Sequence, residues 1–141
     1  MRIVVDSSVI VAALATPNPE SASRVVLGAA AAGAVQLVIT DEVEAEYRRA
    51  VEYPKVVRYA AKVERQAFVG AIVATAYRVV AGSAAGAVPA DPEDEKIVAA
   101  AVAGRAGFIV SLDRHLLGLS GLREIVVLRP GDFLQELRTR H

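Results

Sequence analysis

The sequence predicts a single α/β domain over residues 1–141, with three layers: helices cover both faces of a mostly parallel central sheet of about four to five strands. Short runs rich in β-branched residues alternate with longer helical patterns along the whole chain. No internal repeat, low-complexity segment or second domain interrupts this alternation. A chain of 141 residues is also long enough to bury a core.

The predicted strands are short apolar runs of the length that fits a buried strand. The first, RIVV, begins at Arg2, and the weakest, YRVV, begins at Tyr77. In chain order the runs are residues 2–5, 36–39, 77–80, 107–110 and 124–128.

Helices are expected between and after these strands, because capping and breaking residues bound each helical pattern. The ranges are residues 7–15, about 20–32, 41 to near Pro54, and roughly 56–76 with a break near Gly70. A helix then follows Asp91-Pro92, a short helical turn follows residue 113, and Pro130 opens the last helix.

The composition excludes several classes of protein. There is no cysteine, so disulfides and thiolate metal sites are ruled out. Lys and Arg together equal Asp and Glu at 16 each, so no global basic field indicates nucleic acid. No segment resembles a signal peptide, and the Ala-rich residues 27–35 fall short of the ~20 apolar residues that span a bilayer. We therefore expect a cytoplasmic location and no membrane.

Four acidic residues from remote stretches are placed where they can converge. Asp6 directly follows the first strand, and Asp113 lies just beyond the strand at 107–110. Asp94 opens the helix before that strand, and Glu46 lies in the first turns of the helix after residues 36–39. In open parallel sheets, sites form at the carboxyl ends of strands. These acids can therefore meet at one edge of the sheet.

Each acid also has an ordinary structural explanation. Asp6 and Asp113 could each simply cap the helix that follows. Glu46 alone is better explained as a solvated helix residue. Glu44 borders the same apolar stripe at a similar angle, so periodicity does not choose between Glu44 and Glu46.

Asp94 is singled out by helical geometry. Ile97, Val98 and Ala101 follow it at one and two turns and form the apolar face, so Asp94 points towards the core. Asp91 is the expected N-cap of this helix, and Asp94 could then be the third residue of a capping box, although Glu or Gln is usual there. Buried carboxylates are rare unless they are paired or bind metal, which favours a functional role for Asp94.

Clustered carboxylates with no balancing Lys nearby would repel one another when ionised, and a bound divalent cation relieves that repulsion. Oxygen-only ligands select Mg²⁺ or Mn²⁺ over Zn²⁺. Such a site is suited to attack of water on a phosphodiester bond.

Three stretches of the sequence resemble the PIN-domain nucleases. They are IVVDSSVIVAAL, VITDEVEAEYRRAVEYPKV and DPEDEKIVAAAVAGRAGFIVSLDRHLL. A fourth stretch, VLRPGDFLQEL, looks like the family's usual closing strand and helix. The resemblance covers essentially the whole length and implies a PIN-like fold. It assigns the four metal-binding and catalytic acids to Asp6, Glu46, Asp94 and Asp113.

The resemblance also implies supporting polar residues. Ser7 and Ser8 follow the first acid, and Ser8 stands where Asn is frequent in the family. Ser111 is the hydroxyl of the motif that ends in Asp113, and Asp91 supports the start of its helix.

The implied activity is Mg²⁺- or Mn²⁺-dependent cleavage of RNA. Family members of this size are often toxins of toxin–antitoxin pairs and form homodimers, so a cognate antitoxin protein is a further implied partner. Basic residues that could contact RNA are Arg114, His115, Arg49 and Lys55.

Two other functions are weighed against this one. A PIN-like module could bind RNA or a partner protein with little or no cleavage. A haloacid-dehalogenase-type phosphatase also begins with a strand and an Asp, but it needs a second Asp where this chain has Ser8. We therefore favour the nuclease.

Overall fold

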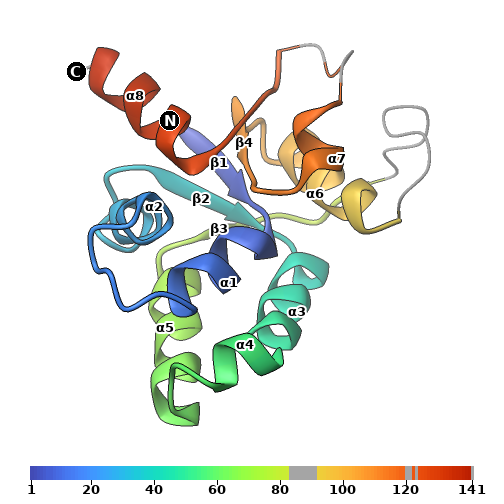
Figure 1. Cartoon of the computed structure of the whole chain (residues 1–141). Helices are drawn as coiled ribbons and strands as arrows, with labels where there is room; N and C mark the ends of the chain where they lie inside the picture. Colours follow the sequence, from blue (N-terminus) through green and yellow to red (C-terminus); the bar gives the residue numbers. More distant parts are fainter. Residues whose placement is uncertain (83–91, 120–121, 123, 141) are drawn as a thin grey trace.

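The computed structural model describes residues 1–82, 92–119, 122 and 124–140 and confirms the α/β class (Figure 1). Within these residues one sheet has the strand order β3-β2-β1-β4-β5, and every neighbouring pair is parallel. The strands are β1 (Arg2–Val5), β2 (Gln36–Ile39), β3 (Tyr77–Arg78), β4 (Phe108–Val110) and β5 (Val126–Leu128). All five predicted strands are present, and β3, β4 and β5 are each shorter than their predicted ranges.

The helices lie where capping residues place them, with one exception. They are α1 (Ser7–Leu14), α2 (Ala22–Ala31), α3 (Asp41–Ala50), α4 (Pro54–Val57), α5 (Lys62–Ala74), α6 (Pro92–Ala103), α7 (Arg114–Leu117) and α8 (Pro130–Thr139). None of the helices in the described ranges is both long and apolar enough to cross a membrane.

The exception is the helix expected over residues 56–76, which was wrong in two ways. The chain forms two helices there, and α5 runs unbroken through Gly70. The break lies earlier, between Val57 and Lys62. The buried side chain of Arg65 reaches back to this segment and donates a hydrogen bond to the carbonyl of Ala60 (2.7 Å). That contact satisfies a carbonyl that a continuous helix would have used internally.

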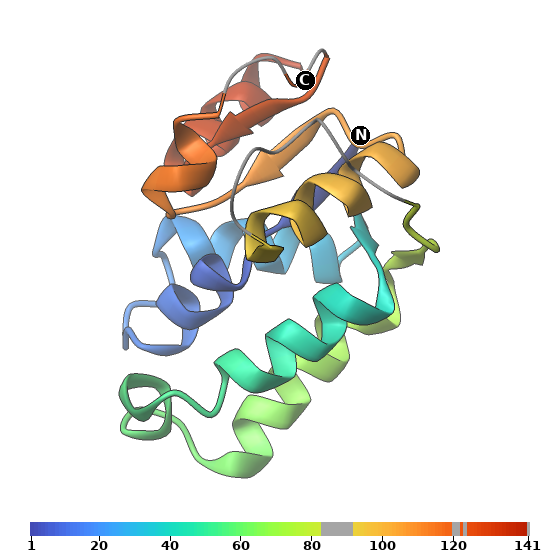
Figure 2. The same ribbon diagram turned by 90° about the vertical axis from the view of Figure 1, so that its right-hand side faces the viewer.

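The elements pack in three layers around a core of Val, Ile, Leu and Ala side chains (Figure 2). Helix α6 lies on one side of the sheet and contacts β1, β2 and β4, whereas α2 packs against α1, α5 and α8. Helices α3 and α5 lie side by side beyond the edge of the sheet where β1 ends. This arrangement brings the starts of α1, α3 and α6 close to the carboxyl end of β1.

The carboxyl end of α6 is packed tightly on the sheet, which fixes the position of the whole helix. A Cβ atom at Gly104 would lie 2.3 Å from a methyl carbon of Val38, so only glycine allows this approach. Arg105 then adopts a positive φ of 54°, and the amide of Ala106 bonds the carbonyl of Ala101 (2.9 Å). The predicted site residue Asp94 is carried on this anchored helix.

Candidate active site

The order of the strands reverses at β1, because the chain builds β2 and β3 on one side of β1 and β4 and β5 on the other. In open α/β sheets such a switch point opens a crevice at the carboxyl ends of the strands. Asp6 follows β1 and Asp113 lies just beyond β4, so both acids stand at this crevice. The amide of Asp6 bonds the carbonyl of Val110 at 2.9 Å, which ties the two strand ends together.

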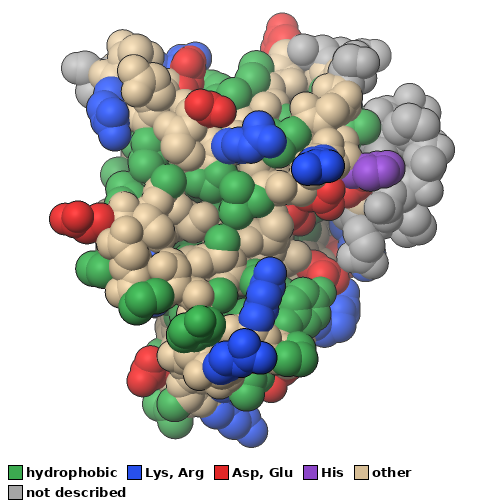
Figure 3. Space-filling model, viewed as in Figure 1, with side chains coloured by type: hydrophobic (Ala, Val, Ile, Leu, Met, Phe, Trp, Pro, Cys, Tyr) green, Lys and Arg blue, Asp and Glu red, His purple; other side chains and the backbone are tan. Residues whose placement is uncertain are grey.

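A cleft of about 690 Å³ lies at this switch point, and all four predicted acids line it. Figure 3 shows acidic side chains gathered next to the histidine, towards the right of the view. The described lining is Asp6, Ser7, Ser8, Val11, Ala12, Val43, Glu46, Arg49, Tyr53, Lys55, Asp94, Lys96, Ile97, Leu112 and Asp113.

Asp6 occupies the N-cap position of α1, but its side chain makes no capping hydrogen bond. Instead its Oδ2 atom accepts hydrogen bonds from the hydroxyls of Ser8 (2.6 Å) and Ser111 (3.0 Å). These hydroxyls in turn accept from the amides of Leu112 (3.0 Å) and Asp113 (2.9 Å), respectively. We call this four-bond arrangement the serine clasp. The purely capping explanation of Asp6 was therefore wrong.

Asp113 combines the two explanations that the sequence left open. Its Oδ1 atom accepts a hydrogen bond from the amide of His115 (2.8 Å), so it does cap α7. The same carboxylate lines the cleft. Because the amide of Asp113 is bonded to Ser111, the serine clasp also fixes this second acid.

Asp94 is buried, with 3% of its surface exposed, as its position on α6 predicts. It lines the cleft, and its Oδ2 atom lies 3.7 Å from Nδ1 of His115. The supporting residue Asp91 lies outside the described residues. The side chain of His115 is largely exposed, which places it at the rim of the cleft rather than in its lining.

The structure separates the two acids of α3 that periodicity could not. Glu46 lines the cleft, and its Oε2 atom forms an ion pair with Arg49 at 2.6 Å. Glu44 lies outside the cleft lining and is hydrogen-bonded to Arg78 and Arg48. The hydrogen bond from Arg78 lowers the pKa of Glu44; burial opposes this effect, and Arg48 adds to it.

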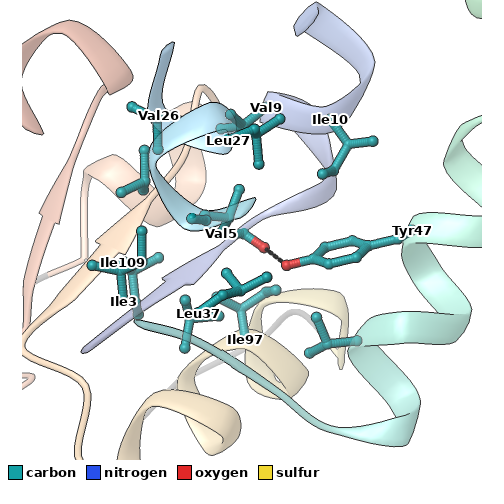
Figure 4. Packing of buried hydrophobic residues seen from close by; sticks show 14 of the residues in the cluster. Ile3, Val5, Val9, Ile10, Val26, Leu27, Leu37, Tyr47, Ile97 and Ile109 are labelled. Carbon is teal, nitrogen blue, oxygen red and sulfur yellow. Dashed lines mark hydrogen bonds between the residues drawn. The ribbon is translucent and has the colours of Figure 1, made fainter. Parts of the chain in front are cut away.

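Helix α3 is fastened to β1 next to both Asp6 and Glu46. Thr40 caps α3 by accepting from the amide of Val43 (3.1 Å). The buried hydroxyl of Tyr47 donates to the carbonyl of Val5 at 2.6 Å (Figure 4). Burial and the nearby charge of Asp6 raise the pKa of Tyr47, so this hydroxyl stays protonated.

Three cations share the described lining with the acids, namely Arg49, Lys55 and Lys96. The expectation that no Lys lies near the carboxylates was wrong. Lys96 projects from α6 two residues after Asp94, and its long aliphatic stem lets the ammonium group reach the cleft. Of the basic residues predicted to contact RNA, Arg49 and Lys55 line the cleft, whereas Arg114 and His115 stand outside it on α7.

The donor groups fit a hard divalent cation by their chemistry. Asp6, Glu46 and Asp113 each engage one carboxylate oxygen in the protein; the other oxygen accepts no hydrogen bond from the described residues. As the side chains lie, however, no three acidic or histidine side chains among the described residues are close enough to hold a metal ion. For three of the described carboxylates to bind one ion, side chains would have to move, for example Glu46 away from Arg49.

Tyr53 and Tyr47 are the residues of the site that the sequence did not reveal. Tyr53 lines the cleft from the segment between α3 and α4. Its signal was the following Pro54, which ends the helical pattern and turns the chain at that point. Tyr47 carried no comparable signal, because it falls on the apolar stripe of α3 like any core residue.

Comparison with known proteins agrees with this geometry. The family model described as PIN domain matches residues 2–115, a range that contains all four cleft acids. Among curated proteins, none matches the chain. The family match extends over far more than half of the sequence, so the chain belongs to the PIN domain family.

Proposed function

We propose that this protein is a ribonuclease that depends on Mg²⁺ or Mn²⁺ and hydrolyses RNA phosphodiester bonds in the switch-point cleft. One observation supports the proposal above the others: four carboxylates from four remote segments line a single cleft. Membership of the PIN domain family, whose members are generally nucleases, adds to it. The donor set of oxygen atoms is the kind that Mg²⁺ and Mn²⁺ prefer.

In this mechanism Asp6, Glu46, Asp94 and Asp113 would hold the cation. When bound, the cation supplies a Lewis acid for the phosphate and activates the attacking water. The serine clasp holds Asp6 and Asp113 in fixed orientations before the substrate arrives, which reduces reorganisation during the reaction.

The cations of the cleft have a different task. Lys55 and Lys96 can attract the RNA phosphate and keep it against the acids. Arg49 neutralises Glu46 while the two remain paired.

The test is Mn²⁺-dependent cleavage of a fluorescent single-stranded RNA by the unaltered chain and by Asp94→Asn. We expect Asp94→Asn to lose about 100-fold or more of the rate. Glu95→Gln, an exposed neighbour on the same helix, is the matched control and should keep full activity. Mn²⁺ should also raise the melting temperature of the unaltered chain more than that of Asp94→Asn. Equal cleavage by the two Asp94 forms would overturn the mechanism.

A second candidate is a PIN-like module that binds RNA or a protein with little or no cleavage. The observation in its favour is that the described acids are not grouped closely enough for a metal ion as they lie. RNA binding that is unaffected by Mn²⁺, with no cleavage at any Mn²⁺ concentration, would favour this function over the nuclease.

The biological setting is proposed on the family resemblance. In this proposal the protein is a cytoplasmic homodimer and the toxin of a toxin–antitoxin pair. Induced expression should then arrest growth, Asp94→Asn should relieve the arrest, and co-expression of an adjacent small gene should also relieve it. Light scattering of the purified protein tests the dimer.

A further inference from the structure

Tyr53 is an aromatic side chain in a cleft otherwise lined mainly by charged and small residues. It is 43% exposed, and within the described residues its side chain makes no hydrogen bond or ring contact. An exposed aromatic ring loses the stabilisation that burial would give it. Its exposed position on the cleft therefore makes it a candidate contact for a ligand.

The backbone presents this ring from a fixed corner of the chain. The amide of Tyr53 bonds the carbonyl of Ala50 (3.1 Å), and its own carbonyl accepts from the amides of Val56 (2.9 Å) and Val57 (3.0 Å). Pro54 follows at the first position of α4 and restricts the backbone further. The backbone that carries the ring is therefore ordered before a ligand binds, which lowers the entropy cost of binding.

The neighbours of the ring are suited to a nucleotide. Arg49 and Lys55 line the same cleft from α3 and α4, so cationic groups lie on both sides of Tyr53 in the sequence. A stacking ring beside basic side chains is the arrangement by which proteins bind single-stranded nucleic acid. In the proposed function the cleft acids would hold a metal ion that binds the phosphate, but they offer no surface for a base.

We propose that Tyr53 is a base-stacking subsite: its ring stacks on an unpaired base of the RNA while Lys55 contacts the adjoining phosphate. The subsite rests on the proposed ribonuclease function and adds to it a means of choosing unpaired substrate. In a duplex both faces of each base are covered by neighbouring bases, so a paired strand cannot use this ring.

A direct test uses the absence of tryptophan from the chain. Tyr53→Trp introduces a single tryptophan, whose fluorescence reports stacking without any need for catalysis. We expect a single-stranded oligoribonucleotide to quench this fluorescence, and the same sequence as a duplex to leave it nearly unchanged. The matched control is Tyr59→Trp, because Tyr59 is also an exposed tyrosine (58%) and lies outside the cleft lining. Equal quenching in both variants would overturn the proposal.

The energetic test compares Tyr53→Ala with Tyr53→Phe. Loss of the ring should weaken binding of single-stranded RNA by about tenfold and raise KM with little change in kcat, whereas Tyr53→Phe should behave like the unaltered chain. An abasic nucleotide at the position facing Tyr53 should weaken binding to the unaltered chain and have no further effect on Tyr53→Ala. Unchanged folding is checked by circular dichroism and thermal melting.

The outcomes separate the subsite from the ribonuclease itself. If the unaltered chain cleaves RNA and Tyr53→Ala cleaves and binds it equally well, the subsite is wrong and the ribonuclease stands. If the unaltered chain neither binds nor cleaves RNA, both are wrong. If Tyr53→Ala changes the oligomeric mass but not RNA binding, the ring belongs to a protein interface and the subsite is again wrong.

Discussion

The two sides of the cleft hold their acids in different ways. On the strand side, Asp6 and Asp113 are held by the neutral hydroxyls of the serine clasp and by backbone amides. On the helix side, Glu46 is held by the charged guanidinium of Arg49. Neutral donors orient a carboxylate and leave its charge for a ligand to compensate, whereas a guanidinium cancels that charge.

This difference indicates which side is preformed and which must adjust. The strand side is tied into the backbone of β1 and β4, so it is set when the sheet forms. The Glu46–Arg49 pair lies towards solvent, with the side chain of Arg49 57% exposed, and exposed pairs of this kind contribute only about 0–1 kcal/mol. In the proposed mechanism Glu46 would be the acid that moves, because its partner Arg49 lies towards solvent.

The largest effect is expected when one acid on each side of the cleft is replaced in turn by its neutral amide. Asp6→Asn should reduce Mn²⁺-dependent cleavage by about 100-fold or more, and Glu46→Gln by about tenfold, because only Asp6 is preformed. Cleavage rates at saturating Mn²⁺ measure both. Glu42→Gln, an exposed acid on the same helix as Glu46, is the matched control and should change nothing. A loss in Glu46→Gln as large as in Asp6→Asn would break the comparison.

Because of the serine clasp, we expect substitutions of Ser8 and Ser111 to have coupled effects on the free energy of unfolding. Both hydroxyls bond the same oxygen of Asp6, and Ser111 is fully buried. Ser111→Ala should lower the free energy of unfolding by about 1–3 kcal/mol, since it leaves the amide of Asp113 without its partner. Ser8→Ala should cost less because Ser8 is only partly buried.

Urea unfolding of the two single variants and the double variant measures this coupling. The effects should depart from additivity by about 0.5 kcal/mol or more, because the two residues share one acceptor. Simple additivity would show that Asp6 is held by two independent contacts instead of one connected arrangement.

The same contrast explains how much the sequence could predict. All five strands were found because each is a short apolar run between helical patterns, a local signal that packing reinforces. Asp94 was found because it is a charged residue on the apolar face of its own helix. Asp6 and Asp113 could also be predicted, because their positions follow directly from where the strands end.

The helix side depended on information that no local pattern contains. Glu44 and Glu46 border the apolar stripe of α3 at similar angles, and only the packing of α3 against α1 and α6 decides which one meets the cleft. Lys96 reaches the cleft through the length of its side chain, which helical angles ignore. Residues 56–76 read as one helix because the sequence pattern does not show that the Arg65 side chain bonds the carbonyl of Ala60 in the segment between α4 and α5.

A smaller effect is expected at the bond that joins the two sides. Tyr47 follows Glu46, and its hydroxyl bonds the carbonyl of Val5, the residue before Asp6. Tyr47→Phe should lower the free energy of unfolding by about 1–2 kcal/mol and raise the Mn²⁺ concentration for half-maximal activity by about tenfold. Tyr59→Phe is the control. If Tyr47→Phe lost stability with no change in Mn²⁺ dependence, the bond would not set the spacing of the acids.

The smallest effect is expected from Arg78, which pairs with Glu44 and Asp41 on the part of α3 outside the cleft lining. Arg78 lowers the pKa of Glu44 in the folded state. The pair therefore stabilises the fold above the ordinary pKa of a glutamate, 4.5, and this contribution is lost as the pH falls below it.

Arg78→Gln should thus reduce the free energy of unfolding by about 0.5–1 kcal/mol at neutral pH and by less at about pH 3, with cleavage unchanged. Urea unfolding at the two pH values and the cleavage rate at neutral pH measure both. Because Glu44 and Glu46 share one helix, a loss of cleavage in Arg78→Gln would mean that charges on both sides of α3 act on the site. The helix side of the cleft would then extend beyond Glu46 and Arg49. If cleavage is unchanged and only stability falls in a pH-dependent way, the helix side of the cleft is limited to Glu46 and Arg49.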